Sequence, residues 1–171
     1  MTTIQFNAPW SRKVRNTTVL SLVILALPLL VAIFAPTQPP LLALILLLAL
    51  PPLIVATTFC ARVRGYTLTE QEIVVHRGFW DTRLALTRLR SVSGDAEAMR
   101  GSVRVFGNGG LFSITGRYWN RKLGWYRAYT TDQSRAVVLR YADRTIVISP
   151  HDPQQFIMRA GTFIRIAGFP K

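Results

Sequence analysis

The fold of this chain is decided first by residues 16–61, which read NTTVLSLVILALPLLVAIFAPTQPPLLALILLLALPPLIVATTFCA and contain no Lys, Arg, Asp, Glu or His. A proline-rich segment at residues 36–40 divides this stretch into two apolar runs, residues 17–35 and 41–61. A bilayer core of about 30 Å takes about 20 helical residues at about 1.5 Å each, so each run is long enough to cross it. We therefore predict a transmembrane helical hairpin at residues 17–61, which excludes a wholly soluble protein.

An alternative interpretation of the first apolar run is a signal peptide followed by a single span. This run is longer than the apolar core of a usual signal peptide. Its small-residue pattern, Ala32-x-x-Ala35, is followed at once by a proline, which disfavours cleavage there. We therefore expect both spans to remain in the protein.

The spans have the composition of an anchor. Apart from the thiol of Cys60 they carry no ionisable group, whereas transport and proton relays usually need buried charge. Pro28 in the first span and Pro51 and Pro52 in the second are expected to kink or locally unwind the helices.

Basic residues flank the outer ends of the hairpin, whereas its connector carries no charge; they are Arg12, Lys13, Arg15, Arg62 and Arg64. Because Lys and Arg are enriched in cytoplasmic loops, both termini are predicted to be cytoplasmic. We expect a multi-pass protein of the cytoplasmic membrane in three parts: an N-terminal segment (residues 1–16), the hairpin (17–61) and a cytoplasmic domain (62–171).

The charge balance and the cysteine count exclude other classes of protein. The chain has 21 Lys+Arg against 8 Asp+Glu, a formal net charge of +13, and 50% of its residues are hydrophobic. Outside the spans it is rich in aromatic and β-branched residues, which excludes a disordered chain. Cys60 is the single cysteine, which excludes a disulfide framework.

Short strand-like segments separated by turns follow the hairpin. We predict strands or extended segments at residues 66–69, 72–77, 83–86, 87–92, 111–118, 125–131, 136–141 and 145–148, with a glycine-rich turn at residues 107–110. No helix separates these strands, which excludes a parallel βαβ architecture. The expected fold is mainly β, with antiparallel strands in a two-sheet sandwich or an open barrel.

The period of the sequence changes near the C-terminus, which predicts one amphipathic helix that caps the β domain. Asp152 is the predicted N-cap and Pro153 the first helical residue. Apolar residues then recur at helical spacing at Phe156, Ile157, Ala160, Phe163, Ile164 and Ala167.

The order of these elements resembles that of bacterial pleckstrin-homology-type (PH-like) domains in small membrane proteins. Several stretches of sequence also resemble that family: residues 66–73, 87–92, 107–112, 123–124 with 129–132, and 147–153 with Phe156. The resemblance covers roughly residues 65 to 165 and implies a binding or scaffolding module without established catalytic residues. Eukaryotic relatives often bind phosphoinositides through a basic cluster between the first two strands. Here that link is Glu70–Gln71, which departs from the pattern because it is short and acidic.

Residues 117–129, RYWNRKLGWYRAY, interleave basic and aromatic residues. Tryptophan side chains suit the membrane interface, and each basic residue near an anionic leaflet contributes about 1 kcal/mol of attraction. The residues that we predict to bind lipid or a partner are Arg117, Trp119, Arg121, Lys122, Trp125 and Arg127. The alternative is an ordinary hairpin with aromatic residues in the core and a solvated basic loop.

Motifs for catalysis or metal binding are lacking. His76 and His151 lie far apart, and the sequence has neither a Cys-x-x-Cys nor a His-Glu-x-x-His pattern. The acidic residues are scattered, mostly at turns and caps. We therefore predict no enzyme activity, no metal and no cofactor.

The predicted function is that of a membrane-anchored PH-like binding or scaffolding module at the cytoplasmic face. Alternatives are a sensor of anionic lipid headgroups, through the basic and aromatic loop, and an accessory subunit of a larger membrane complex. The expected partners are the lipid bilayer and another membrane or membrane-associated protein, and a homo-oligomer is compatible with the sequence. Nucleic acid is disfavoured, because the basic residues are spread from Arg77 to Arg165 without a recognition motif.

Overall fold

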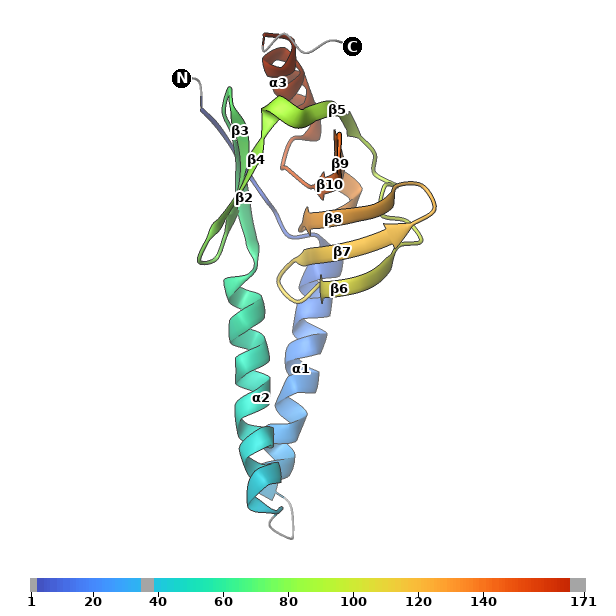
Figure 1. Cartoon of the computed structure of the whole chain (residues 1–171). Coiled ribbons are helices and arrows are strands. Elements are labelled where there is room, and N and C mark those ends of the chain that lie inside the picture. The colour runs from blue at the N-terminus through green and yellow to red at the C-terminus, as the bar shows by residue number, and fades with distance from the viewer. Residues whose placement is uncertain (1–2, 35–38, 167–171) are drawn as a thin grey trace.

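The computed structural model describes residues 3–34 and 39–166, and the chain forms two long helices beneath a β domain (Figure 1). Helix α1 spans Arg12–Phe34 and helix α2 spans Leu41–Cys60. The two helices lie side by side, and the β domain sits at the end where α1 begins and α2 ends (Figure 1). Ala35, the predicted last residue of the first span, lies outside the described residues.

Both helices are long and apolar enough to cross a membrane. Most of their side chains, including Leu20, Val23 and Leu46, are exposed, which is unlike the core helix of a soluble protein. The chain therefore has two candidate membrane-spanning helices. Helix α1 continues through Pro28, and α2 through Pro51 and Pro52, without a break in the helix.

Helix α1 begins earlier than the apolar run, because Ser11 caps it. The Ser11 Oγ accepts a hydrogen bond from the Val14 N–H at 3.1 Å. The first turns of α1 are thus basic and lie against the β domain, where Val14 is fully buried.

A four-stranded antiparallel sheet has the order β1-β2-β3-β4. Its strands are β1 (Ile4–Asn7), β2 (Val63–Leu68), β3 (Glu72–Arg77) and β4 (Asp81–Ala85). Strand β1 precedes α1, and no strand was predicted there. It pairs with β2 and buries Phe6, whose ring meets that of Phe156 edge-on at 5.1 Å between centroids. The N-terminal segment is therefore part of the β domain, and removal of β1 would expose the core.

A six-stranded sheet has the order β5-β9-β10-β8-β7-β6. Its strands are β5 (Leu89–Gly94), β6 (Val103–Gly109), β7 (Ile114–Asn120), β8 (Gly124–Thr130), β9 (Val137–Tyr141) and β10 (Thr145–Ile148). The expectation of purely antiparallel strands is wrong at one position, because β10 pairs parallel to β8. The chain crosses from β8 to β9 through a short 3-10 turn at Gln133–Arg135, and β10 then returns between them.

Strand β6 occupies part of the segment for which the sequence predicts a glycine-rich turn. The strand runs through Gly107 and Gly109, and the turn follows it. Gly107 lies opposite Gly116 of β7, and both have positive φ, at 115° and 134°. A Cβ on Gly107 would lie 2.3 Å from the Thr115 carbonyl oxygen, so only glycine permits this close approach.

The main core lies between the two sheets and beneath helix α3 (Pro153–Ile166). Asp152 caps α3 as predicted, since its Oδ1 accepts a hydrogen bond from the Gln155 N–H at 2.9 Å. Phe156 and Ala160 are fully buried in the core. The side chain of Ile164 and all of Ala167, predicted for the same stripe, lie outside the described part of the chain.

The buried Tyr66 ties the two sheets together. Its hydroxyl donates to the Tyr129 carbonyl at 2.6 Å and accepts from the Ser149 N–H at 3.1 Å. Burial raises the pKa of Tyr66 to about 12. The predicted two-sheet sandwich with a C-terminal helix is thus confirmed.

A second, smaller core fixes α1 to the other face of the six-stranded sheet. It combines Val14 of α1 with Tyr118, Tyr126 and the turn at Ala98–Met99. Farther along α1, the Thr18 Oγ1 donates to the Gly110 carbonyl at 3.1 Å. The same oxygen accepts from the Phe112 N–H at 2.9 Å. The hairpin and the β domain are therefore packed together.

Candidate functional site

The β7–β8 hairpin carries four of the six predicted binding residues on one face. Arg117 lies directly opposite Arg127, and Trp119 lies directly opposite Trp125. All four side chains are exposed, and Trp125 is 64% exposed. The neighbouring Tyr118 and Tyr126 point to the opposite face, into the small core, as strand alternation requires.

The ordinary-hairpin alternative therefore describes only part of this segment. The tyrosines are packed as that alternative predicts. The tryptophans are not, since Trp119 and Trp125 lie outside both cores. Two bulky aromatic side chains thus remain available at the surface.

The other two predicted residues, Arg121 and Lys122, lie at the tip of the hairpin. The Lys122 Nζ forms an ion pair with the Asp95 Oδ2 at 2.5 Å. The Asn120 side chain fixes the tip, because its Oδ1 accepts from the Leu123 N–H at 2.7 Å. The six predicted residues are therefore divided between the hairpin face and the tip.

Strand β6 extends the same face with two residues that are not among the six predicted ones. Val103 lies opposite Trp119, and Phe106 lies opposite Arg117. The register shifts between Arg104 and Phe106, so Val105 is the extra residue of a β-bulge and Val103 and Phe106 share one face. We call the six residues the basic–aromatic face: Val103, Phe106, Arg117, Trp119, Trp125 and Arg127.

This face is the open continuation of the core side of the six-stranded sheet. Trp125, Arg127 and Tyr129 alternate along β8 and therefore point the same way. Tyr129 is buried in the main core between the sheets, whereas Arg127 and Trp125 are exposed. The four-stranded sheet thus leaves this end of the six-stranded sheet uncovered.

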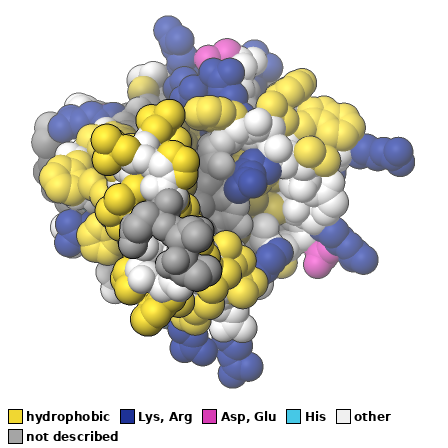
Figure 2. Space-filling view, turned by 90° about the horizontal axis from the view of Figure 1, so that it is seen from below, with side chains coloured by type: hydrophobic (Ala, Val, Ile, Leu, Met, Phe, Trp, Pro, Cys, Tyr) yellow, Lys and Arg dark blue, Asp and Glu magenta, His cyan; other side chains and the backbone are white. Residues whose placement is uncertain are grey.

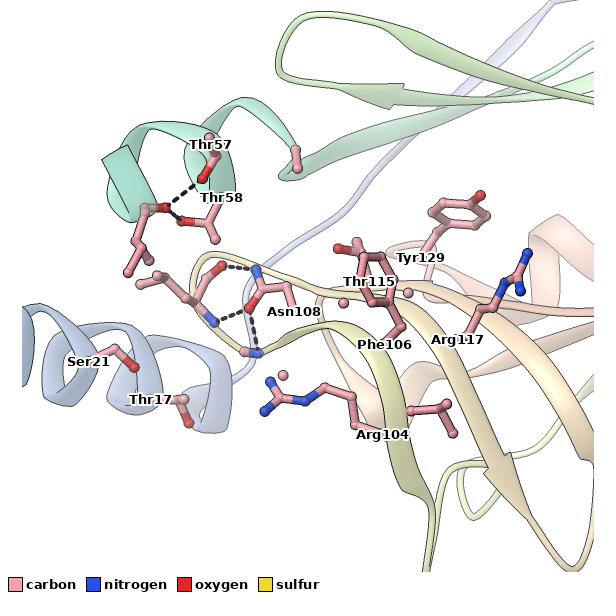
Figure 3. Close-up of a pocket in the computed structure, with 18 of the residues that line it drawn as sticks. Thr17, Ser21, Thr57, Thr58, Arg104, Phe106, Asn108, Thr115, Arg117 and Tyr129 are labelled. Carbon is pink, nitrogen blue, oxygen red and sulfur yellow. Dashed lines mark hydrogen bonds between the residues drawn. The ribbon is translucent and has the colours of Figure 1, made fainter. Parts of the chain in front are cut away.

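A large groove separates this uncovered end from the two helices. Its cavity volume is about 1280 Å³. Figure 3 shows Thr17 and Ser21 of α1 on one side, and Phe106 and Arg117 of the strands on the other. We call this space the hairpin groove. The two helices contribute Ile24 and Leu25 of α1 and Ile54, Thr57 and Thr58 of α2 to its lining. The lining residues from the β domain include Arg77, Arg104, Phe106, Arg117, Trp125 and Arg127.

Positive charge dominates the hairpin groove, since none of its lining residues is acidic. Within the described part of the chain, Arg104, Arg117 and Arg127 make no ion pair. Seen from below, Lys and Arg side chains lie at the border between the apolar helices and the β domain (Figure 2). The groove is thus suited to an anion.

Arg77 has a structural role at the end of α2. Its Nε and Nη2 donate to the Ala61 carbonyl at 3.1 and 3.0 Å, which caps the helix C-terminus. Partial burial lowers the pKa of Arg77 from its usual value. Arg77 therefore adds positive charge to the groove, although its guanidinium is already hydrogen-bonded to the Ala61 carbonyl.

A hydroxyl–imidazole–carboxylate row crosses the four-stranded sheet. Thr67 Oγ1 lies 2.6 Å from His76 Nε2, and His76 Nδ1 lies 3.0 Å from Asp81 Oδ1. Thr67 is only 7% exposed and lies in a strand paired on both sides, so the surrounding backbone N–H groups are bonded within the sheet. An acyl-transfer site needs an accessible nucleophile and free oxyanion donors, so this row stabilises the sheet surface instead.

Metal ligands do not cluster in the part of the chain that the structure describes. No group of three or more His, Cys, Asp or Glu side chains there could hold a metal ion. Cys60 is a free, half-buried thiol at the end of α2.

Comparison with known protein families identifies the β domain. Residues 64–161 match the family model described as the bacterial PH domain. Comparisons with curated proteins and with solved structures gave no match. The matched range begins in β2, after both long helices, and ends within α3, so it covers the sandwich and more than half of the chain. The chain therefore belongs to the bacterial PH domain family.

Proposed function

We propose that this protein is a membrane-anchored, non-catalytic binding module that recognises anionic groups at the cytoplasmic surface of the membrane. The observation that carries this proposal is the basic–aromatic face. It presents Arg117 and Arg127 beside exposed Trp119 and Trp125, next to two candidate membrane-spanning helices. PH domains are generally non-catalytic, which agrees with a binding role.

The anchor makes weak recognition effective. A binding face held beside the bilayer meets its ligands at high local concentration, so contacts of about 1 kcal/mol per basic residue are sufficient for occupancy. The packing of Val14 and Thr18 against the β domain supports a fixed position of this face relative to the spans.

The orientation follows from the same charges that flank the spans. The first turns of α1 carry Arg12, Lys13 and Arg15, and the chain after α2 carries Arg62 and Arg64; all lie at the end of the hairpin that bears the β domain. The positive-inside rule supports a cytoplasmic β domain with both termini on the same side.

A thermal-shift measurement on the full-length protein in neutral detergent tests this function. A ligand that binds only the folded state raises the Tm. We expect phosphatidylglycerol to raise the Tm more than phosphatidylcholine with the same acyl chains, and high salt to reduce the difference. The double substitution Arg117→Glu with Arg127→Glu should abolish it.

The matched control reverses two exposed arginines far from this face, Arg88→Glu with Arg90→Glu. This control should keep the response to phosphatidylglycerol, since the overall charge change is the same. Equal shifts with both lipids, or an undiminished response after charge reversal at Arg117 and Arg127, would contradict the proposal.

A second candidate function is recruitment of a protein partner along β6. This strand forms the edge of the six-stranded sheet, and Val103, Val105 and Phe106 on it are exposed. An unpaired edge with apolar side chains is a template for the addition of a strand from another protein. A photo-cross-linking residue at Val105 in the native membrane should then capture a protein that the same residue at Thr87 does not, and equal capture at both positions would exclude this role.

A further inference from the structure

We propose that the hairpin groove holds one anionic phospholipid, with its phosphate between Arg117 and Arg127 and an acyl chain along Ile24, Leu25 and Ile54. This inference rests on the proposed function and names its ligand. It also places the contact between lipid and protein in the space between the domain and the helices, and not on the open surface of the domain.

The polarity of the groove changes in one direction, as an amphiphile requires. Along α1 the lining residues pass from Thr17 through Ser21 to Ile24 and Leu25, about 12 Å into the predicted span at about 1.5 Å per residue. Helix α2 mirrors this order, since its lining passes from Ile54 at depth to Thr57 and Thr58 near the domain. Both helices therefore offer apolar side chains at depth and hydroxyl groups toward the arginines.

The arginines at the domain end suit a phosphate. A guanidinium presents paired N–H donors that match two phosphate oxygens, and Arg117 and Arg127 lie on adjacent strands directly opposite each other. Arg104 of β6 also lines the groove, but it lies opposite Tyr118 and so belongs to the other face of the sheet. With no carboxylate in the lining, Arg117 and Arg127 remain without a counterion in the described structure.

The size of the groove fits more than a small anion. Small-molecule pockets commonly enclose about 300–1,000 Å³, and the hairpin groove encloses about 1280 Å³. A free phosphate would leave the apolar walls at Leu25 and Ile54 empty. A headgroup with part of its acyl chains fills both the charged and the apolar parts.

Hydrogen bonds within the loop after β6 fix one wall of the groove. Asn108 shapes the loop after β6: its Oδ1 accepts from the Gly110 and Leu111 N–H groups at 3.2 and 3.0 Å, and its Nδ2 donates to the Leu111 carbonyl (Figure 3). The ordered loop is then fixed to α1 by Thr18, as described above. A wall held by internal hydrogen bonds loses less conformational entropy on binding, which favours the retention of a single lipid.

Native mass spectrometry of the full-length protein in neutral detergent tests this inference. Equimolar phosphatidylglycerol and phosphatidylcholine with identical acyl chains are the probes. The wild type should retain one phosphatidylglycerol per chain, with at least tenfold preference over phosphatidylcholine. The substitution Arg117→Gln with Arg127→Gln should reduce this preference at least tenfold. Glycerol phosphate, the headgroup without acyl chains, should fail to displace the lipid at millimolar concentration.

A steric variant separates the groove from the open face. Ser21→Trp fills the groove from α1 without changing any charge and should abolish retention of phosphatidylglycerol. Leu22→Trp is the matched control, because Leu22 is exposed and does not line the groove. It should retain the lipid as the wild type does.

Each other outcome has a definite meaning. If Ser21→Trp retains phosphatidylglycerol normally while the arginine variant loses it, the lipid binds the open face, so the groove inference fails and the proposed function stands. Displacement by glycerol phosphate would likewise exclude a lipid held by its acyl chains. If the wild type shows no preference between the two lipids, both the inference and the proposed function fail.

Discussion

Arg117 on β7 lies directly opposite Arg127 on β8, and neither guanidinium pairs with a carboxylate in the described part of the chain. Like charges at directly opposed positions of an antiparallel pair destabilise a sheet. A sequence that departs from such a local rule usually does so at a functional site. An anionic ligand between the two side chains would remove the repulsion.

The opposed arginines Arg117 and Arg127 predict that a substitution at this pair has opposite effects on stability and on lipid binding. Arg117→Gln should stabilise the ligand-free protein by about 0.2–1 kcal/mol, because it removes the repulsion with Arg127, and it should weaken the response to phosphatidylglycerol. Thermal unfolding in lipid-free detergent measures the first effect. Arg140→Gln is the control, since Arg140 on β9 lies opposite Thr145 and should show neither effect. A loss of stability in Arg117→Gln would contradict the prediction.

The close approach of β6 and β7 predicts a strong requirement for glycine. Gly116→Ala would place a Cβ 2.1 Å from the Phe106 carbonyl oxygen at a φ of 134°. We expect a destabilisation of about 2–4 kcal/mol, measured by chemical denaturation in detergent. Gly101→Ala is the control because its φ is also positive, at 64°, but beyond its two chain neighbours no described residue lies within 4 Å of the added Cβ. Equal losses in the two variants would show that φ strain alone is responsible.

The pairing of β1 with β2 predicts that the N-terminus stabilises the domain. Phe6 is 5% exposed and packs on Phe156, so Phe6→Ala should destabilise the protein by about 3–5 kcal/mol. Phe106→Ala should change stability by less than about 0.5 kcal/mol, because Phe106 is 76% exposed. A domain fragment that starts at Arg62 should be less stable than one that retains residues 1–18 through a flexible linker. Equal stability of the two fragments would mean that β1 is dispensable.

The buried hydroxyl of Tyr66 predicts a loss of stability at high pH. Its pKa is about 12 in the folded protein and about 10 in the unfolded chain, so between pH 10 and 12 the folded state binds more protons. The stability contributed by this group is complete below pH 10 and declines through pH 12, by about 2–3 kcal/mol in total. Denaturation midpoints at pH 8, 10 and 11.5 measure the decline.

The substitution Tyr66→Phe isolates this contribution. It should reduce the pH dependence and destabilise the protein at pH 8 by about 1–3 kcal/mol, since Ser149 and the Tyr129 carbonyl lose their buried partner. Tyr141 is the comparison, because its pKa is also raised to about 12 by burial but its hydroxyl has no hydrogen-bond partner among the described residues. Tyr141→Phe should therefore leave the stability at pH 8 nearly unchanged. An unaltered pH profile in Tyr66→Phe would contradict the assignment.

Elements with a strong local signal could be predicted from the sequence. The uncharged runs predict α1 and α2, and the Asp152–Pro153 cap with its apolar stripe predicts α3. The β1 strand could not be predicted, because its four residues pair with β2, which follows both long helices in the sequence. The parallel pairing of β10 with β8 could not be predicted either, because the chain first passes through β9 before β10 returns beside β8.

The candidate site was only partly predictable for the same reason. The alternation of basic and aromatic residues along 117–127 indicates a binding face in this segment. The strand register was needed to show that Trp119 is exposed on that face whereas Tyr118 points to the other side. Val103 and Phe106 lay before a glycine run that resembled a turn, although the pattern Val-Arg-Val-Phe was a signal for a strand. The hairpin groove combines residues from α1, α2 and β6–β8, and no local pattern contains that arrangement.

The most direct test of anionic lipid recognition beside the spans is the fluorescence of Trp125 in the full-length protein. A variant with Trp10, Trp80 and Trp119 changed to Phe retains Trp125 as the single tryptophan. Phosphatidylglycerol brominated on its acyl chains near the headgroup should quench this fluorescence and saturate at one lipid per chain. Brominated phosphatidylcholine should quench it at least tenfold less at the same concentration. Equal quenching by the two lipids, or none by either, would contradict the claim that this protein binds an anionic lipid between its helices and its PH-like domain.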